Sequence, residues 1–326
     1  MTARTVLLIA VAAALIYPLC GVNDFYVNIA SQVLIYGLLA LSLNILVGFA
    51  GLTSLGHAAY LGLAAYVCAW LTINLGWSPV PAGLAAIAGG TLVAAFFGLL
   101  SLRASGLGFL MITLALGQIV WGIAYRWVSL TGGDNGLKLS ERPSLFGVSL
   151  NTPSSFYYAM LVLFLAVQFL IWRLQGSAYG ACIRGTRDQP RRMRMLGHDV
   201  WLIQWTAFVL SGLLGSVAGV SFIYYNQYIS PHALSLQQSA EVLLMVILGG
   251  AGTLTGPLVG AIVVTLTKNV LSSYIDRWSM LLGLIFVVTV ILMPRGIVPG
   301  LARLIQRWRP PVPAERSSIS VAEPHA

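Results

Sequence analysis

The chain has 326 residues and a formal net charge of +9, and its composition excludes an ordinary soluble domain. Apolar residues make up 58% of the sequence, charged residues make up only 8%, and the mean hydropathy is +0.86. Apolar runs of about 20 residues recur, and each can cross a hydrocarbon core of roughly 30 Å as a helix. The basic residues gather beside these runs rather than along a surface stripe, so membrane orientation explains the charge better than nucleic-acid binding. We therefore expect an all-α polytopic membrane protein.

The apolar segments predict about ten membrane-crossing or re-entrant helices in a single domain over residues 1–309, followed by a disordered tail over 310–326. The first segment follows Arg4 in the order of a signal peptide, but bulky residues stand where cleavage needs small ones, so we interpret it as a helix. The segment at 237–250 is too short to cross comfortably, and it either tilts or re-enters. The expected segments are 6–16, 29–47, 55–75, 80–102, 107–128, 156–172, 201–225, 237–250, 254–274 and 278–293.

An arginine-rich loop over 175–200 separates two long apolar blocks, and Asp188 is its only acid before Gly197. Basic residues beside membrane helices resist translocation, so this loop and the arginine-rich end of the last segment are predicted to be cytoplasmic. With about ten crossings, the same rule predicts that the mixed-charge loop around Gly132–Gly136 lies on the opposite side of the membrane and that both termini lie in the cytoplasm. The loop either only fixes orientation and contacts anionic lipid, or docks a cytoplasmic partner.

Within this loop the sequence predicts a short helix from Asp188 to Leu196, with Asp188 as its N-cap and Gly197 after its last turn. Helical spacing would place Arg191 and Arg194 on one face, with Met195 beside them. Gly185 precedes this helix and is expected to tolerate alanine. The candidate docking residues are Arg184, Arg187, Asp188, Arg191, Arg192, Arg194 and Gly197.

Two glycine-rich blocks, at 48–51 and 249–252, can break helices at membrane depth. Such breaks are tolerated where the freed backbone groups are buried in protein or face water. Their similarity indicates either an internal repeat or a chance match in glycine-rich sequence. Small residues at four-residue spacing also favour close helix packing. The candidate packing residues are Gly51, Gly62, Gly215, Gly219, Gly252, Gly256 and Gly260.

Few polar side chains interrupt the apolar segments. Glu241 either has a function inside the membrane or meets the dipole of the helix that it begins, and we prefer the dipole interpretation. His57 either satisfies a local backbone group or contacts a ligand. Ser54 and His57 would share one helix face, but no acid nearby would orient the histidine, so no catalytic residue is predicted. The three cysteines lack CxxC spacing, and no metal site is predicted. The candidate pathway residues are Asn44, Ser54, His57, Thr113, Gln118 and Glu241.

Four blocks in order resemble the LivM-type permeases of ABC importers for branched-chain and hydrophobic amino acids: NILVGFAGLTSLGHAAYLGLAAY, LRASGLGFLMITLALGQI, TGGDNGL and SAEVLLMVILGGAGTLTGPLVGA. The resemblance covers residues 29–300 and departs at Leu52, where many members carry glutamine. It implies a type II ABC importer-like permease in the bacterial inner membrane. Relatives of the same type carry urea or aromatic acids, so these solutes stay open as alternatives.

The resemblance also implies partners: a second, LivH-like permease in a heterodimer, two cytoplasmic ATPase subunits, a periplasmic solute-binding protein and membrane lipid. Neither Lys138 nor Lys268 is preceded by glycine, so no GxxxxGK[ST] phosphate loop exists here. The chain is therefore expected to bind no cofactor, and the partners would hydrolyse ATP. In such importers a cytoplasmic coupling helix docks in the ATPase, and Gly180–Gly197 looks like that element. The alternative from another class is a secondary transporter driven by protons or sodium.

Overall fold

The computed structural model describes residues 23–139, 142, 144–145, 148–271 and 296–307, with scattered positions between 280 and 293. Six helices within this part are long and apolar enough to cross a membrane. The first expected segment, half of the last one and the tail over 310–326 lie outside the described residues, so the count of about ten stays a prediction. The six helices are α2 (Asp24–Asn44), α3 (Ala58–Leu75), α4 (Pro79–Ser101), α5 (Leu107–Arg126), α7 (Pro153–Gln175) and α10 (Val200–Asn226).

Shorter elements connect these helices and follow them. α2 continues without interruption into a π-helical segment, η2, and the two together form one span to Ala50. Four strands of two residues each pair as β1 with β4 and β2 with β3, both antiparallel. The remaining elements are η2 (Ile45–Ala50), α6 (Val128–Thr131), η3 (Gly133–Asn135), β1 (Leu137–Lys138), β2 (Ser144–Leu145), β3 (Val148–Ser149), α8 (Ala178–Asp188), α9 (Pro190–Met195), β4 (Tyr228–Ile229), η4 (Pro231–Leu234), α11 (Leu236–Gly249), α12 (Gly256–Leu271) and α14 (Ile297–Arg307).

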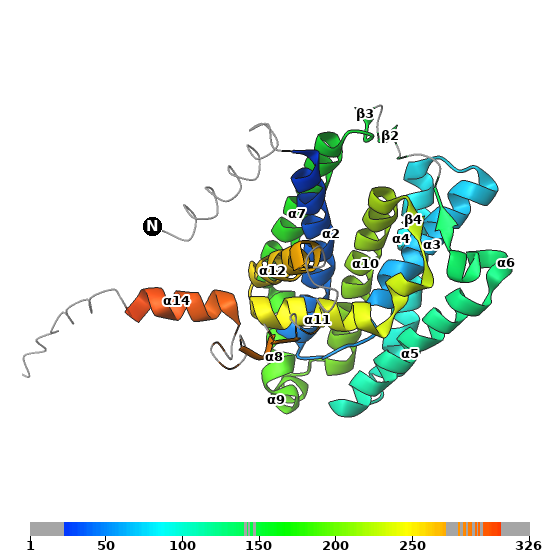
Figure 1. Ribbon diagram of the computed structural model, residues 1–326. Helices are drawn as coiled ribbons and strands as arrows, with labels where there is room; N and C mark the ends of the chain where they lie inside the picture. The colour runs from blue at the N-terminus through cyan, green and yellow to red at the C-terminus, as the bar shows by residue number, and fades with distance from the viewer. Residues whose placement is uncertain are drawn as a thin grey trace, which may run out of the picture.

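The span formed by α2 and η2 is the centre of the fold, with 94% of its most apolar stretch buried. Its leucines, such as Leu38 and Leu41, are fully enclosed, and α7, α10, α11 and α12 pack around it (Figure 1). In contrast, only 33% and 22% of the corresponding stretches of α4 and α5 are buried. Exposed apolar faces of this size mark contact with lipid or another protein.

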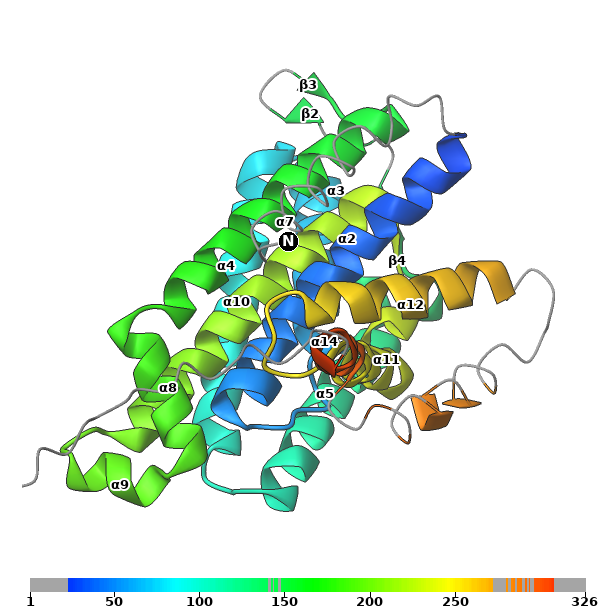
Figure 2. The same ribbon diagram turned by 90° about the vertical axis from the view of Figure 1, so that its left-hand side faces the viewer.

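α11 and α12 lie across α2 rather than along it (Figures 1 and 2). α11 has 14 residues and therefore spans about 21 Å, which is less than a hydrocarbon core of roughly 30 Å. This length and orientation agree with the expectation that the segment at 237–250 tilts or re-enters.

Glycines allow the helix backbones to approach closely. A Cβ at Gly219 would meet the backbone carbonyl of Leu61, so α10 and α3 touch there without side chains between them. A Cβ at Gly260 would likewise meet the carbonyl of Met245, which joins α12 to α11. Gly252 differs from the expectation, because it lies in the turn before α12 with a φ of 82°. The small residues from Gly252 to Gly260 are therefore not one continuous helical row.

We expect Gly219→Val to destabilise the protein by about 1–3 kcal/mol, because the added side chain must separate α10 from α3. Gly89→Val is the matched control, since a Cβ at Gly89 meets no atom within 4 Å. The midpoint of thermal unfolding of the purified protein measures the difference. Equal midpoints for the two variants would show that close packing at Gly219 contributes nothing.

The arginine-rich loop and the mixed-charge loop lie at opposite ends of the long helices. α8 and α9 are at one end, and the β2–β3 hairpin is at the other (Figures 1 and 2). This is the arrangement that the positive-inside interpretation requires. Which end faces the cytoplasm stays a prediction.

A topology reporter tests that prediction directly. A reporter fused at Gln189 should read as cytoplasmic, and one inserted within Gly132–Gly136 should read as periplasmic, because arginines favour the untranslocated side. A periplasmic result at Gln189 would overturn the orientation.

Candidate functional site

The span formed by α2 and η2 ends beside α8, where its last carbonyls need partners. Gly51 ends it with a φ of 72°, a conformation that glycine adopts without strain. Asn44 Oδ1 accepts a hydrogen bond from the backbone N–H of Gly252 at 2.8 Å, and Asn44 Nδ2 donates to the carbonyl of Thr253 at 2.9 Å. A Cβ at Gly48 would meet the backbone of Gly252. The two glycine-rich blocks are therefore in contact, while the internal repeat stays a prediction.

α8 contacts the same break from the arginine-rich loop. The helix begins after Ser177, whose Oγ accepts a backbone N–H of the first turn at 3.2 Å. In its last turn, Arg187 Nη1 donates to the carbonyl of Gly48 at 2.6 Å, and the Arg187 side chain lies where a Cβ at Gly51 would be. Arg187 Nε also donates to Asp188 Oδ1 at 2.9 Å. A positive charge at the carbonyl end of a helix is favourable, so Arg187 completes the end of η2.

α9 begins one residue later than expected and has a different N-cap. Asp188 is the last residue of α8 rather than the N-cap of α9, and its carboxylate pairs with Arg187. Gln189 occupies the N-cap position without a side-chain hydrogen bond, and Pro190 opens the helix at a position where its missing N–H costs nothing. Gly197 follows the helix with a φ of 82°.

α8 and α9 pack on each other through Met193, which is buried. A Cβ at Gly185 would lie 2.8 Å from Met193 Sδ, so α9 sits directly on that glycine. Gly185 precedes α9, as expected, but it lies within a further helix, α8, that the sequence did not predict. Arg184 Nη1 donates to the carbonyl of Gln175 at 2.9 Å, which ties α8 to α7.

The outer face of α9 is exposed and combines positive charge with apolar surface. Arg191, Arg192 and Arg194 are all exposed. Met195 and Leu196 expose 86% and 67% of their surface. Exposed apolar residues surrounded by charge are typical of an interaction surface.

His57 lies in a buried polar cluster on the other side of the break. Its Nε2 is 2.7 Å from Ser42 Oγ, and Ser211 Oγ donates to the Ser42 carbonyl at 2.6 Å. Ser54 Oγ accepts from the backbone N–H of Gly56 at 3.4 Å, and within the described residues Ser54 and His57 form no hydrogen bond with each other. These contacts join α2 to α10 and give His57 a structural partner that the sequence does not indicate.

The extended segment after the break is held by hydroxyl groups of other helices. Thr113 Oγ1 accepts the backbone N–H of Leu55 at 3.3 Å, and Ser239 Oγ accepts that of Ala58 at 3.2 Å. These two backbone N–H groups have no helical hydrogen-bond partner, so the hydroxyls supply the acceptors that they need. Gln118 lies half-buried on α5, one turn beyond Thr113.

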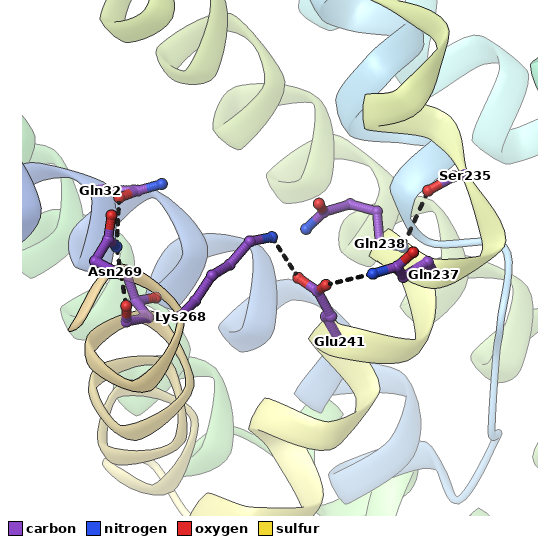
Figure 3. Close-up of polar contacts among 8 residues, drawn as sticks. Gln32, Ser235, Gln237, Gln238, Glu241, Lys268 and Asn269 are labelled. Carbon is purple, nitrogen blue, oxygen red and sulfur yellow. Dashed lines mark hydrogen bonds and ion pairs between the residues drawn. The ribbon is translucent and has the colours of Figure 1, made fainter. Parts of the chain in front are cut away.

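Glu241 has an ion-pair partner on the following helix. Lys268 Nζ on α12 lies 2.9 Å from Glu241 Oε2, and Gln237 Nε2 donates to Glu241 Oε1 at 3.4 Å (Figure 3). α11 begins at Leu236, so Glu241 is in its second turn rather than at its start. The dipole interpretation is therefore wrong, because that effect is confined to the first turn.

Comparison with known proteins identifies the family. Residues 25–291 match the family model described as the permease component of branched-chain amino acid transport systems. The chain belongs to this family. It is 30% identical over 300 residues to the high-affinity branched-chain amino acid transport system permease protein LivM of Escherichia coli K12, covering 84% of this chain and 70% of the relative. LivM of Salmonella typhimurium matches to the same extent.

Permeases named for other solutes are also related. The fructose import permease protein FrcC of Rhizobium meliloti is 24% identical over 274 residues, covering 80% of this chain and 75% of that protein. The autoinducer 2 import system permease protein LsrC of Yersinia pseudotuberculosis is 28% identical over 219 residues, covering 64% and 59%. No solved structure matches the chain. This permease is thus a multi-pass inner-membrane protein of an ABC-type transport family.

Sequence reasoning missed three partners in this permease: Ser42 for His57, Lys268 for Glu241, and the Gly48 carbonyl for Arg187. Lys268 could have been found, because a lone lysine in an apolar segment requires a compensating charge. The other two could not, since serine is common in membrane helices and a backbone carbonyl has no sequence signature.

We expect Asn44→Asp to destabilise the permease by about 1–3 kcal/mol, because the carboxylate cannot donate to Thr253 and leaves a buried carbonyl without its partner. Asn74→Asp on α3 is the matched control, since Asn74 is exposed. Thermal unfolding of the two purified variants gives the comparison. An Asn44→Asp variant as stable as Asn74→Asp would contradict the role of Asn44.

Proposed function

We propose that this permease is the membrane subunit of an ABC importer that translocates branched-chain or other hydrophobic amino acids. The observation that carries the proposal is the 30% identity to LivM across 84% of the chain. The relatives named for fructose and autoinducer 2 are less similar, at 24% and 28% over shorter alignments. Because these relatives are named for other solutes, the second candidate function is a permease of the same type for another small solute.

The proposed complex contains a second, LivH-like permease, two cytoplasmic ATPase subunits and a periplasmic binding protein. The chain carries no GxxxxGK[ST] motif, which supports ATP hydrolysis by partner subunits and no bound cofactor here. Both termini and the arginine-rich loop are proposed to lie in the cytoplasm, as the distribution of arginines indicates.

α8 and α9 are proposed to transmit movement of the ATPase to the membrane helices. The exposed face of α9 supports docking, because it combines three arginines with Met195 and Leu196. The hydrogen bond from Arg187 to the Gly48 carbonyl supports transmission, because it joins the loop directly to the break in the central span. From there Asn44 continues the connection to the turn between α11 and α12. A displacement of α8 would therefore move both the end of η2 and the turn between α11 and α12.

Uptake by reconstituted protein tests the function. Proteoliposomes that contain the permease with its partner permease, ATPases and binding protein should accumulate radiolabelled leucine only with ATP inside. The chain alone should accumulate none, whereas a secondary transporter would work without ATPases. Competition by unlabelled fructose or urea, with none by isoleucine, would favour the second candidate.

Reversing the charge of the docking face tests the coupling. Arg191→Glu combined with Arg194→Glu should lower recovery of the ATPase in a pull-down by about tenfold or more, because like charges across an interface cost several kcal/mol. Insertion and pairing with the partner permease should persist. If the loop only fixes orientation, ATPase recovery will be unchanged and a topology reporter will detect inverted protein.

Arg187→Met provides the matched control. Arg187 faces the break rather than the exposed surface of α9, so this variant should retain the ATPase in the pull-down and still lose ATP-driven uptake. Loss of ATPase recovery in Arg187→Met would place Arg187 in the docking surface and contradict its role in transmission.

A further inference from the structure

Three helices bring polar side chains together around the Glu241–Lys268 ion pair (Figure 3). α11 contributes Glu241 and Gln237, and α12 contributes Lys268 and Asn269. α2 contributes Gln32, whose Oε1 accepts from Asn269 Nδ2 at 3.0 Å. Such a concentration of charged and amide groups is unusual in helices that are otherwise apolar, and the pathway candidates on other helices contain no second ion pair among the described residues.

The cluster has hydrogen-bonding capacity that the described protein groups do not use. Gln238 Nε2 and Thr265 Oγ1 are buried and have no hydrogen-bond partner within the described part of the chain. They expose only 5% and 1% of their surface, and each lies within one turn of a member of the ion pair. Buried polar groups are normally satisfied, so such groups beside an ion pair indicate a place for another molecule.

Stability does not explain the ion pair. The desolvation of the buried Glu241 carboxylate and the partly buried Lys268 ammonium offsets much of their attraction, and apolar replacements of such pairs are often as stable. Ionisable groups inside the membrane instead mark pathways for solutes and ions. The two partners also differ in access, since the Lys268 side chain is 28% exposed and that of Glu241 only 6%. A solute can therefore reach the pair from the lysine side.

We propose that Glu241 and Lys268 form a transient binding site for the zwitterionic backbone of an amino acid, an inference that rests on the proposed import of amino acids. The α-ammonium of the solute pairs with the Glu241 carboxylate, and its α-carboxylate pairs with the Lys268 ammonium. The flexible lysine stem allows the ammonium to move aside by the width of the solute. Gln238 and Thr265 are placed to donate further hydrogen bonds to the carboxylate.

The charges explain why this site suits a zwitterion. Without the solute, Glu241 and Lys268 neutralise each other at 2.9 Å. With the solute between them, each protein charge faces an opposite charge on the solute, so no charge is left unpaired in either state. A carboxylic acid without an amine would separate the buried Glu241 carboxylate from Lys268 and offer it no positive charge in exchange. Neutral sugars would separate the pair and supply no charge to either side.

Charge variants test the site in the reconstituted importer. Glu241→Gln and Lys268→Gln should each lower leucine uptake by about tenfold or more, as expected when one member of a buried charge pair is removed. The exchange Glu241→Lys with Lys268→Glu should restore the yield and thermal stability of the complex but not uptake. The exchanged charges would force the solute to enter reversed, with its side chain on the opposite side. Full recovery of uptake in the exchanged variant would show a purely structural pair and overturn the proposal.

A labelling experiment keeps the test independent of folding defects in the charge variants. Gln237 is exposed and lies beside Glu241, so Gln237→Cys in a background without the native cysteines should react with a small maleimide. Leucine should slow this reaction several-fold, while isocaproate, isopentylamine and fructose should not. The matched control is Leu236→Cys, which is exposed and next to it in sequence, and leucine should leave its reaction unchanged.

The outcomes separate this inference from the proposed function. Leucine uptake by the unmodified importer, without protection of Gln237→Cys by leucine, would overturn the zwitterion site and leave the function intact. Equal protection by leucine and isocaproate would also overturn it, because no role would remain for the ammonium. Absence of uptake of any branched-chain amino acid by the unmodified importer would instead overturn the proposed function.

Discussion

The last carbonyls of a long helix have no partner within the helix, and this constraint determines how the central span of this permease ends. The freed backbone groups find partners in other elements of the protein. The last turns of η2 find them in Arg187, which donates to the Gly48 carbonyl, and in Gly51, which ends the helix. The turn between α11 and α12 finds its partner in Asn44. Two irregular segments, about two hundred residues apart, thus become one connected unit.

Burial of polar side chains elsewhere follows the same constraint. Ser42, His57 and Ser211 satisfy one another between α2 and α10, while Glu241 and Lys268 do so between α11 and α12. The first group joins two helices, although His57 Nδ1 is buried without a hydrogen-bond partner among the described residues. The second group carries charge and lies beside amide and hydroxyl groups without described partners, and we propose that it accepts a solute. The two groups therefore differ in charge rather than in whether their hydrogen bonds are complete.

The sequence predicted the helical class, the family and the approximate bounds of six spans, because apolar runs of membrane length have few other interpretations. It also placed the C-terminal end of α9 correctly before Gly197, where backbone chemistry is local. It failed where the partner is distant in sequence. Glu241 was interpreted as the start of a helix, whereas the helix starts at Leu236 and Glu241 pairs with Lys268 on the following helix.

The contact between Met193 and Gly185 has a consequence for the orientation of α9. The arginines supply attraction to a partner, but they do not determine the angle at which they are presented. That angle follows from the thioether of Met193 resting on a position without a side chain. A methyl group at Gly185 would press on Met193, whose flexible side chain would have to move to make room for it. The orientation of α9 thus depends on the packing of two uncharged residues as well as on its arginines.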